Sequence, residues 1–309
     1  MRLMHTPDTQ AATVSRLRIH PLLVIGATVL LAVALLLTVP YQSNWWKVII
    51  LGIVEGLTEF LPISSTGHLL IASDLLAYEG SLDGTFEIFI QLGAVLAVVG
   101  FYARDLLAQV RAVPHDRAAR RFWLAIVIAF IPAALFGLLF YSTIKTVLFS
   151  PLVIGISLIV GGIVLILVER MPLRPATALD VTQITLRQAL GIGLAQVLAL
   201  IPGVSRSGSS IMGSLLVGLD RKTATAFSFY LAIPTLGMAT IVELLLSLER
   251  LTSDDLSSLL LGAVVSFIVA WLSIGWLLRY VASNSFVNFG IYRIFAGIVI
   301  LVLIAAGQL

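Results

Sequence analysis

The chain has 309 residues, of which 59% are hydrophobic and only 11% are charged, and its mean hydropathy is +1.07. One soluble core cannot bury that much apolar side chain, so the composition excludes a soluble globular protein and predicts a chain embedded in the lipid bilayer. The absence of cysteine excludes disulfides, thiolate metal sites and cysteine nucleophiles, and a net charge of +3 is too small to indicate a nucleic-acid partner.

The first 44 residues contain one apolar stretch, 21–40, which matches the ~20 residues that cross a bilayer as a helix. Arg16 and Arg18 precede it. Because basic residues stay on the cytoplasmic side, we expect an extra N-terminal transmembrane helix that runs outward from a cytoplasmic N-terminus. A cleaved signal peptide is the alternative, since a basic start and an apolar stretch are common to both. Residues 45–309 are predicted to form a single membrane-embedded domain.

Two glutamates stand four positions apart in the apolar stretch that follows. Glu55 and Glu59 share one face of a helix, with Cβ atoms roughly 5–6 Å apart. A charge at bilayer depth is disfavoured by at least ~2.5 kcal/mol, so an acid there is a functional candidate. The pair could hold Mg²⁺ or Ca²⁺ through oxygen ligands, or one member could act as a base. The structural alternative is that the glutamates lie at an interface or only pair with Arg206.

A polar loop comes next and carries four side chains that suit phosphate chemistry: Ser64, Ser65, Thr66 and His68. Hydroxyls serve as nucleophiles or phosphate donors, and histidine moves protons near neutral pH. The loop cannot face lipid, because each unpaired backbone group there would cost several kcal/mol. We therefore expect a re-entrant hairpin rather than two full spans. By itself the motif is weak, since such runs often only cap a helix.

Further along the chain, four stretches are apolar and long enough to span the bilayer: 122–141, 151–168, 256–278 and 291–306. Arginines concentrate in loops 104–121 and 169–187, which we place in the cytoplasm, and this forces 142–150 outside. The acidic segments 79–87 and 249–255 are also expected outside.

A second polar loop, 202–210, supplies a cation. Arg206 lies between Ser205 and Ser207 among small residues that let backbone N–H groups point at an anion. An arginine flanked by serines at a helix start suits phosphate. The alternative is that Arg206 only marks cytoplasmic topology.

The two loops look like copies of one another. An offset of 141 residues (205 minus 64) relates Ser64 to Ser205 and persists to Phe86 and Phe227. From the distribution of charged residues, we expect the two copies, about 45–168 and 187–309, to enter the membrane from opposite faces. These features predict an all-α polytopic fold: an inverted-topology repeat with two re-entrant helical hairpins and about six core transmembrane helices. Chance identity of small residues is the alternative.

At these two segments the sequence resembles the undecaprenyl-pyrophosphate phosphatase family, also known as the bacitracin-resistance proteins. The matching segments are Glu55-Gly-Leu-Thr-Glu59-Phe-Leu-Pro-Ile-Ser-Ser-Thr-Gly-His68 and Pro202-Gly-Val-Ser-Arg-Ser-Gly-Ser-Ser210. The likeness extends from about Trp46 to the C-terminus and includes Ile291-Tyr-Arg293. Ser210 departs from the family's usual threonine but keeps the hydroxyl.

The resemblance implies hydrolysis of the C55 polyprenyl diphosphate to the monophosphate and inorganic phosphate, which recycles the lipid carrier of cell-wall synthesis. It also implies a place in the bacterial inner (plasma) membrane, with the active site open to the outer, periplasmic side. The residues that match the family's active-site positions are Glu55, Glu59, Ser65, His68 and Arg206. The sequence leaves open whether the chain forms a homodimer.

The residues themselves offer the same reaction class, because phosphoryl transfer needs charge neutralisation and positioning. We expect Arg206 and a divalent ion to balance the diphosphate while Ser65 or an activated water attacks, with Glu59 or His68 handling the proton. The residues expected to bind substrate alongside Arg206 are Ser64, Thr66, Ser205 and Ser207. A secondary transporter or lipid flippase is the alternative function, because inverted repeats with broken helices are first a transporter feature.

Overall fold

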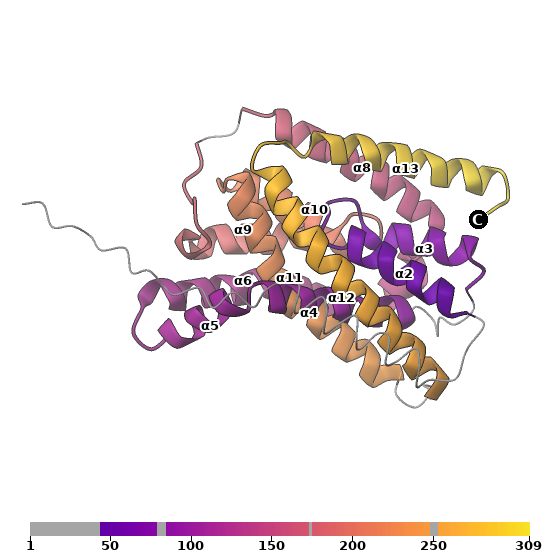
Figure 1. Ribbon diagram of the computed structural model, residues 1–309. Helices are drawn as coiled ribbons and strands as arrows, with labels where there is room; N and C mark the ends of the chain where they lie inside the picture. Colours follow the sequence, from indigo (N-terminus) through magenta and orange to yellow (C-terminus); the bar gives the residue numbers. More distant parts are fainter. Residues whose placement is uncertain (1–43, 79–84, 173–174, 248–252) are drawn as a thin grey trace, which may run out of the picture.

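The computed structural model describes residues 44–78, 85–172, 175–247 and 253–309 (Figure 1). These residues form helices, short turns and one isolated bridge between Ala178 and Leu219. The helices in chain order are α2 (Trp45–Thr58), α3 (Ser65–Leu75), α4 (Thr85–Phe101), α5 (Ala103–Ala112), α6 (Arg117–Leu139), α7 (Tyr141–Thr143), η1 (Ile144–Leu148), α8 (Pro151–Arg170), η2 (Val181–Gln183), α9 (Leu186–Val197), η3 (Leu198–Leu200), α10 (Arg206–Leu216), α11 (Arg221–Ser247), α12 (Ser253–Val281) and α13 (Val287–Ala305). The predicted N-terminal transmembrane helix and the segments 79–84 and 248–252 lie outside the described residues.

Five of the described helices are long and apolar enough to cross a membrane, namely α6, α8, α11, α12 and α13. A sixth span results if α4 and α5, which are bent by 65° at their junction, count as one. The prediction of an all-α protein that crosses the membrane several times is therefore confirmed. The apolar stretches identified in the sequence did not include α11. This helix is less apolar than the other four because it contains Ser, Thr and Pro234.

Two pairs of short helices stand apart from these spans. The members are α2 with α3 and α9 with α10, each 11 to 14 residues long. At 1.5 Å per residue, none of them reaches across a ~30 Å hydrocarbon layer. Both α3 and α10 follow a serine with positive φ, 71° at Ser64 and 78° at Ser205. Non-glycine residues rarely adopt this conformation, so the two copies share an unusual backbone as well as a motif.

Each short helix that leads into a polar loop packs against a long helix from the other half of the chain. Helix α2 contacts α12, and α9 contacts α6. Glycines permit the close approach, because a Cβ at Gly56 would lie 2.7 Å from the Ser266 carbonyl oxygen and one at Gly193 would lie 2.6 Å from that of Ala129. Small residues at such crossings let two backbones touch, as in other membrane helix pairs. The two halves are thus interlocked rather than side by side.

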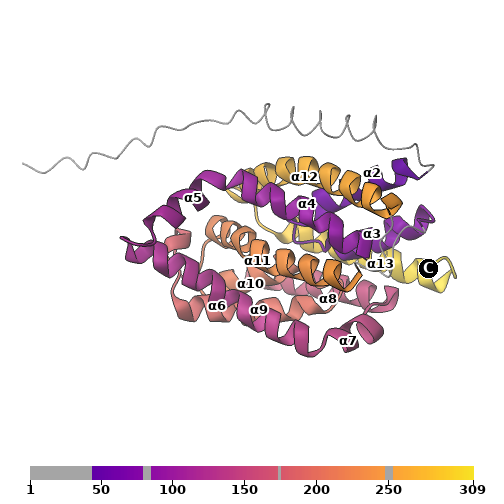
Figure 2. The ribbon, with the colours of Figure 1, turned by 90° about the horizontal axis from the view of Figure 1, so that it is seen from below.

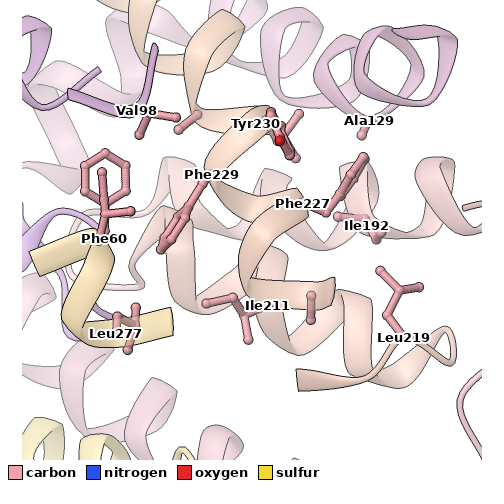
Figure 3. Close-up of a cluster of buried hydrophobic side chains, with 14 of the residues drawn as sticks. Phe60, Val98, Ala129, Ile192, Ile211, Leu219, Phe227, Phe229, Tyr230 and Leu277 are labelled. Carbon is pink, nitrogen blue, oxygen red and sulfur yellow. The ribbon is translucent and has the colours of Figure 1, made fainter. Parts of the chain in front are cut away.

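Figure 3 shows part of the hydrophobic cluster that includes Phe60, which stands just before the first polar loop, and Phe227 and Phe229 of α11. Phe60 meets Phe229 of α11 edge to face, with ring centroids 5.2 Å apart. Phe60 immediately follows Glu59, so its burial fixes the end of α2 in the core. The C-terminal helix α13 runs beside α8 (Figures 1 and 2), where Gly162 and Gly290 allow backbone contact.

Candidate active site

One carboxylate joins the two polar loops. Ser65 Oγ donates a hydrogen bond to Glu59 Oε2 at 2.5 Å, and Arg206 Nη2 lies 2.9 Å from Glu59 Oε1. All three side chains are largely buried, with exposed fractions of 5% for Glu59, 5% for Ser65 and 9% for the Arg206 side chain. Three residues that the sequence predicted to act together therefore do meet, because α2 ends just before Glu59 while Ser65 and Arg206 begin α3 and α10.

The Arg206 guanidinium is held from two sides and keeps one donor free. Its Nη1 donates to the carbonyl oxygen of Ser228 at 2.9 Å and to the Ser228 hydroxyl at 3.2 Å. Its Nε is buried and has no hydrogen-bond partner among the described residues. Such a donor calls for an acceptor, and a phosphate oxygen meets that need. Sequence reasoning missed Ser228, because one serine in a helix of mixed polarity carries no distinctive signal.

Glu55 is completely buried, one helical turn before Glu59. Neither of its carboxylate oxygens has a hydrogen-bond partner among the described residues. It lies within electrostatic range of Glu59 and Arg206. A buried carboxylate without donors is unfavourable unless a proton or a cation satisfies it.

The carboxylate oxygens of Glu55 fit a divalent cation whose remaining ligands would come from substrate phosphate and water. Both oxygens of Glu59 already have partners, whereas those of Glu55 are available. Across the described ranges, no group of three or more His, Cys, Asp or Glu side chains could form a metal site on its own. Magnesium is often bound by one or two carboxylates with phosphate oxygens and water completing its shell. The residues present are compatible with that arrangement.

His68 contacts Tyr292 of α13. Its Nδ1 lies 2.7 Å from the Ser64 carbonyl oxygen, so Nδ1 carries the proton, because a carbonyl only accepts. Its Nε2 lies 2.7 Å from the hydroxyl of Tyr292, which therefore donates to it, and the two rings stack 5.5 Å apart. Of the two side chains expected to handle the Ser65 proton, Glu59 is the one that contacts Ser65.

The remaining predicted substrate-binding hydroxyls divide into two kinds. Ser205 Oγ accepts from the Gly208 N–H and contacts Ser207 Oγ, which donates to the Leu61 carbonyl oxygen at 2.8 Å. Ser205 thus shapes the second loop, whereas Ser207 ties that loop to the backbone just before Pro62 of the first loop. The matching Ser64 hydroxyl does not cap α3, and Thr66 is half-buried on the first turn of that helix.

Sequence reasoning also missed Arg293 of α13, which is 1% exposed. Its Nη1 donates to the Pro62 carbonyl oxygen at 3.1 Å and its Nη2 to that of Gly203 at 3.0 Å. Pro62 and Gly203 are equivalent positions of the two loops, because they are related by the same offset of 141. The available signal was that Arg293 is the one charged residue in the apolar stretch of α13.

Comparison with known proteins agrees with this arrangement. The family model described as Bacitracin resistance protein BacA matches residues 48–299. An undecaprenyl-diphosphatase of Deinococcus radiodurans is 50% identical over 269 residues, covering 86% of this chain and 97% of that protein. An undecaprenyl-diphosphatase of Albidiferax ferrireducens is 49% identical over 258 residues, covering 82% and 93% respectively. The match covers both loops and all the helices that carry them, so the chain belongs to the BacA family of bacitracin resistance proteins.

Proposed function

We propose that this chain is an undecaprenyl-diphosphate phosphatase, which hydrolyses the C55 polyprenyl diphosphate to the monophosphate and inorganic phosphate. The relatives named undecaprenyl-diphosphatase match it over more than four fifths of its length. The observation that carries the proposal is the Glu59 carboxylate, which binds a hydroxyl nucleophile through one oxygen and a guanidinium through the other. Such a group can accept a proton at the point where a phosphate is held.

In the first step, Ser65 Oγ attacks the terminal phosphorus while its proton passes to Glu59 Oε2. The bond to the bridging oxygen breaks, and the polyprenyl monophosphate leaves. Water then attacks the phosphoserine and the bond between phosphorus and Ser65 Oγ breaks. Protonated Glu59 returns its proton to Ser65 Oγ, which restores the hydroxyl, and the water proton leaves with the inorganic phosphate. The 2.5 Å contact supports Glu59 as the base, since a general base must lie within hydrogen-bond reach.

Arg206 serves as the phosphate clamp. Ser228 and Glu59 orient its guanidinium plane, and the unpartnered Nε offers a donor to the substrate. Preorganised charge of this kind stabilises a phosphoryl transition state without any reorganisation during reaction. The hydroxyls of Ser64 and Thr66 are further candidates for substrate binding, because no capping role occupies the Ser64 side chain.

Glu55 would hold a divalent cation, Mg²⁺ or Ca²⁺, with Glu59 close by. A bound cation would neutralise the diphosphate and polarise its oxygens. The fit rests on the two buried Glu55 oxygens that lack partners among the described residues. It also explains why a carboxylate is retained at a depth where charge is strongly disfavoured.

We further propose that the chain lies in the bacterial inner membrane and that its two halves form an inverted-topology repeat. Support comes from the equal offset of the two loops, their shared positive φ at Ser64 and Ser205, and the exchange of helix contacts between halves. With the arginine-rich loops in the cytoplasm, the site is placed near the midplane and open to the outer side.

The same repeat favours a transporter as the second candidate. Release of inorganic phosphate from a polyprenyl diphosphate by pure protein in detergent separates the two, because transport needs a sealed membrane and hydrolysis does not. We expect phosphate release, and a Ser65→Ala variant purified in parallel should lose it. Absence of release by well-folded wild-type protein that still binds the diphosphate lipid would favour transport.

A further inference from the structure

We propose that Arg293 is a positioning residue that sets the separation of the two active-site loops, and thereby the alignment of Ser65 with Arg206. Only its effect on turnover rests on the proposed phosphatase function. The geometric part concerns the two loops themselves and can be tested without activity.

Every donor of the Arg293 guanidinium is directed to backbone. Besides Pro62 and Gly203, its Nε lies 3.4 Å from the Leu158 carbonyl oxygen and its Nη2 lies 3.3 Å from that of Ser157. Within the described part of the chain, Arg293 forms no ion pair with an acid. A buried cation is costly, and a simple tie between α8 and α13 could be made by apolar side chains at lower cost. What the guanidinium adds is a rigid planar fork that reaches both loops at once.

The two loop carbonyls that Arg293 contacts stand at the same distance along the chain from the proposed reacting residues. Pro62 lies three residues before Ser65, and Gly203 lies three residues before Arg206. Between each contact and each reacting group stands a serine with positive φ, Ser64 or Ser205. Such a backbone is strained and persists only when its surroundings hold it. Arg293 supplies the same constraint to both copies.

Glycines make the space that this fork occupies. A Cβ at Gly161 of α8 would lie 2.1 Å from Arg293 Nη2, 2.8 Å from Cζ and 3.4 Å from Nε, so its three nearest neighbours all belong to Arg293. A Cβ at Gly155, also on α8 and facing α13, would have atoms of the apolar side chains Leu301 and Ile300 as its three nearest neighbours, the closest being 2.9 Å away. The two glycines therefore provide a matched pair of substitutions, one that displaces the guanidinium and one that disturbs only apolar packing.

The kinetic test compares Arg293→Lys, Arg293→Gln, Gly161→Ala and Gly155→Ala in the full chain. If the fork positions the loops, the first three should lose kcat by roughly 10- to 100-fold, because a displacement of about 1 Å costs that much, with KM changed less than about threefold. Lysine should not rescue, since one ammonium cannot reach both carbonyls. Gly155→Ala should keep kcat within about threefold of wild type and show only a lowered Tm.

The geometric test uses the absence of native cysteine. A Ser65→Cys, Arg206→Cys pair should be bridged by a short bifunctional thiol reagent, and the yield should fall several-fold when Arg293→Gln or Gly161→Ala is added but not when Gly155→Ala is added. Wild-type phosphate release tests the proposed phosphatase separately. Unchanged crosslinking in the Arg293→Gln and Gly161→Ala backgrounds would overturn the inference. So would rescue of kcat by lysine, or an equal loss of kcat in Gly155→Ala.

Discussion

Ser65 and Arg206 contact opposite oxygens of a single carboxylate, that of Glu59, although they are 141 residues apart (206 minus 65). Each begins a helix that follows a serine of positive φ. The proposed nucleophile and the proposed phosphate clamp are thus related by the same offset as the two loops, and one acid, Glu59, contacts both. The two loops therefore have corresponding backbones but carry different side chains at the equivalent positions Ser65 and Arg206.

Glu59→Gln is expected to lower kcat by roughly 10²- to 10⁴-fold, because the amide keeps the shape but cannot accept the Ser65 proton. Phosphate release from a polyprenyl diphosphate in detergent is the measurement. Glu243→Gln is the control, since Glu243 is also buried and ion-paired, with Lys145 at 2.8 Å. That variant should lose thermal stability and retain turnover. Equal turnover in Glu59→Gln and wild type would remove Glu59 as the base.

Arg206→Lys should be almost as damaging as Arg206→Ala. The planar guanidinium contacts Ser228 and Glu59 at once while its Nε is left for the proposed phosphate, and a point charge cannot replace it. Ser228→Ala is the milder comparison, because the Ser228 carbonyl oxygen still accepts from Nη1; its activity should fall by less than about tenfold, in line with one hydrogen bond. Near-normal kcat/KM in the lysine variant would refute the clamp.

Removal of divalent cations should abolish activity, and adding back Mg²⁺ or Ca²⁺ should restore it. Glu55→Gln should raise the cation concentration that gives half-activity, because one of the two available oxygens becomes an amide nitrogen. The readout is phosphate release titrated against metal. Full activity in excess EDTA contradicts a metal role for Glu55.

Tyr292→Phe keeps the ring that stacks on His68 and removes only the hydroxyl that donates to Nε2. We expect roughly a 2- to 10-fold loss of kcat, the equivalent of ~0.5–1.5 kcal/mol for one hydrogen bond. Nitrogen NMR of labelled histidine should show a single tautomer, protonated at Nδ1, in the wild type and a mixture in the variant. Tyr280→Phe, whose hydroxyl accepts from Asn288 instead, should leave both readouts unchanged. An unaltered His68 tautomer in Tyr292→Phe contradicts this role.

Single cysteines test the membrane orientation. Thr146, His115 and Leu179 are all exposed in the structure, so each can report on its own side. In intact cells an impermeant thiol reagent should label Thr146→Cys, while His115→Cys and Leu179→Cys should react only after the membrane is opened. Labelling of His115→Cys and Leu179→Cys in intact cells, with Thr146→Cys protected, would show that the protein has the opposite orientation in the membrane.

Several features of this protein follow from the sequence without a structure. The membrane environment follows from hydropathy, because no soluble core could hide so much apolar surface. The candidate residues Glu55, Glu59 and Arg206 follow from the energetic penalty on charge at depth, which makes every acid or cation in an apolar stretch conspicuous. The sequence also predicts a repeat, because the offset of 141 residues between the two loops persists to Phe86 and Phe227.

Other features depended on which side chains face one another. The sequence left Glu59 and His68 as equal candidates for the Ser65 proton, and only the folded loop places Glu59 on Ser65 and turns His68 toward Tyr292. Arg293 stands out in the sequence as a charge in an apolar stretch, but its contacts could not be predicted, since its bond with Pro62 spans 231 residues and goes to a backbone carbonyl. Every residue type has a backbone carbonyl, so no sequence motif reveals which carbonyls will accept a hydrogen bond. Only the packing of α13 against α8 brings the Arg293 guanidinium between the two loops.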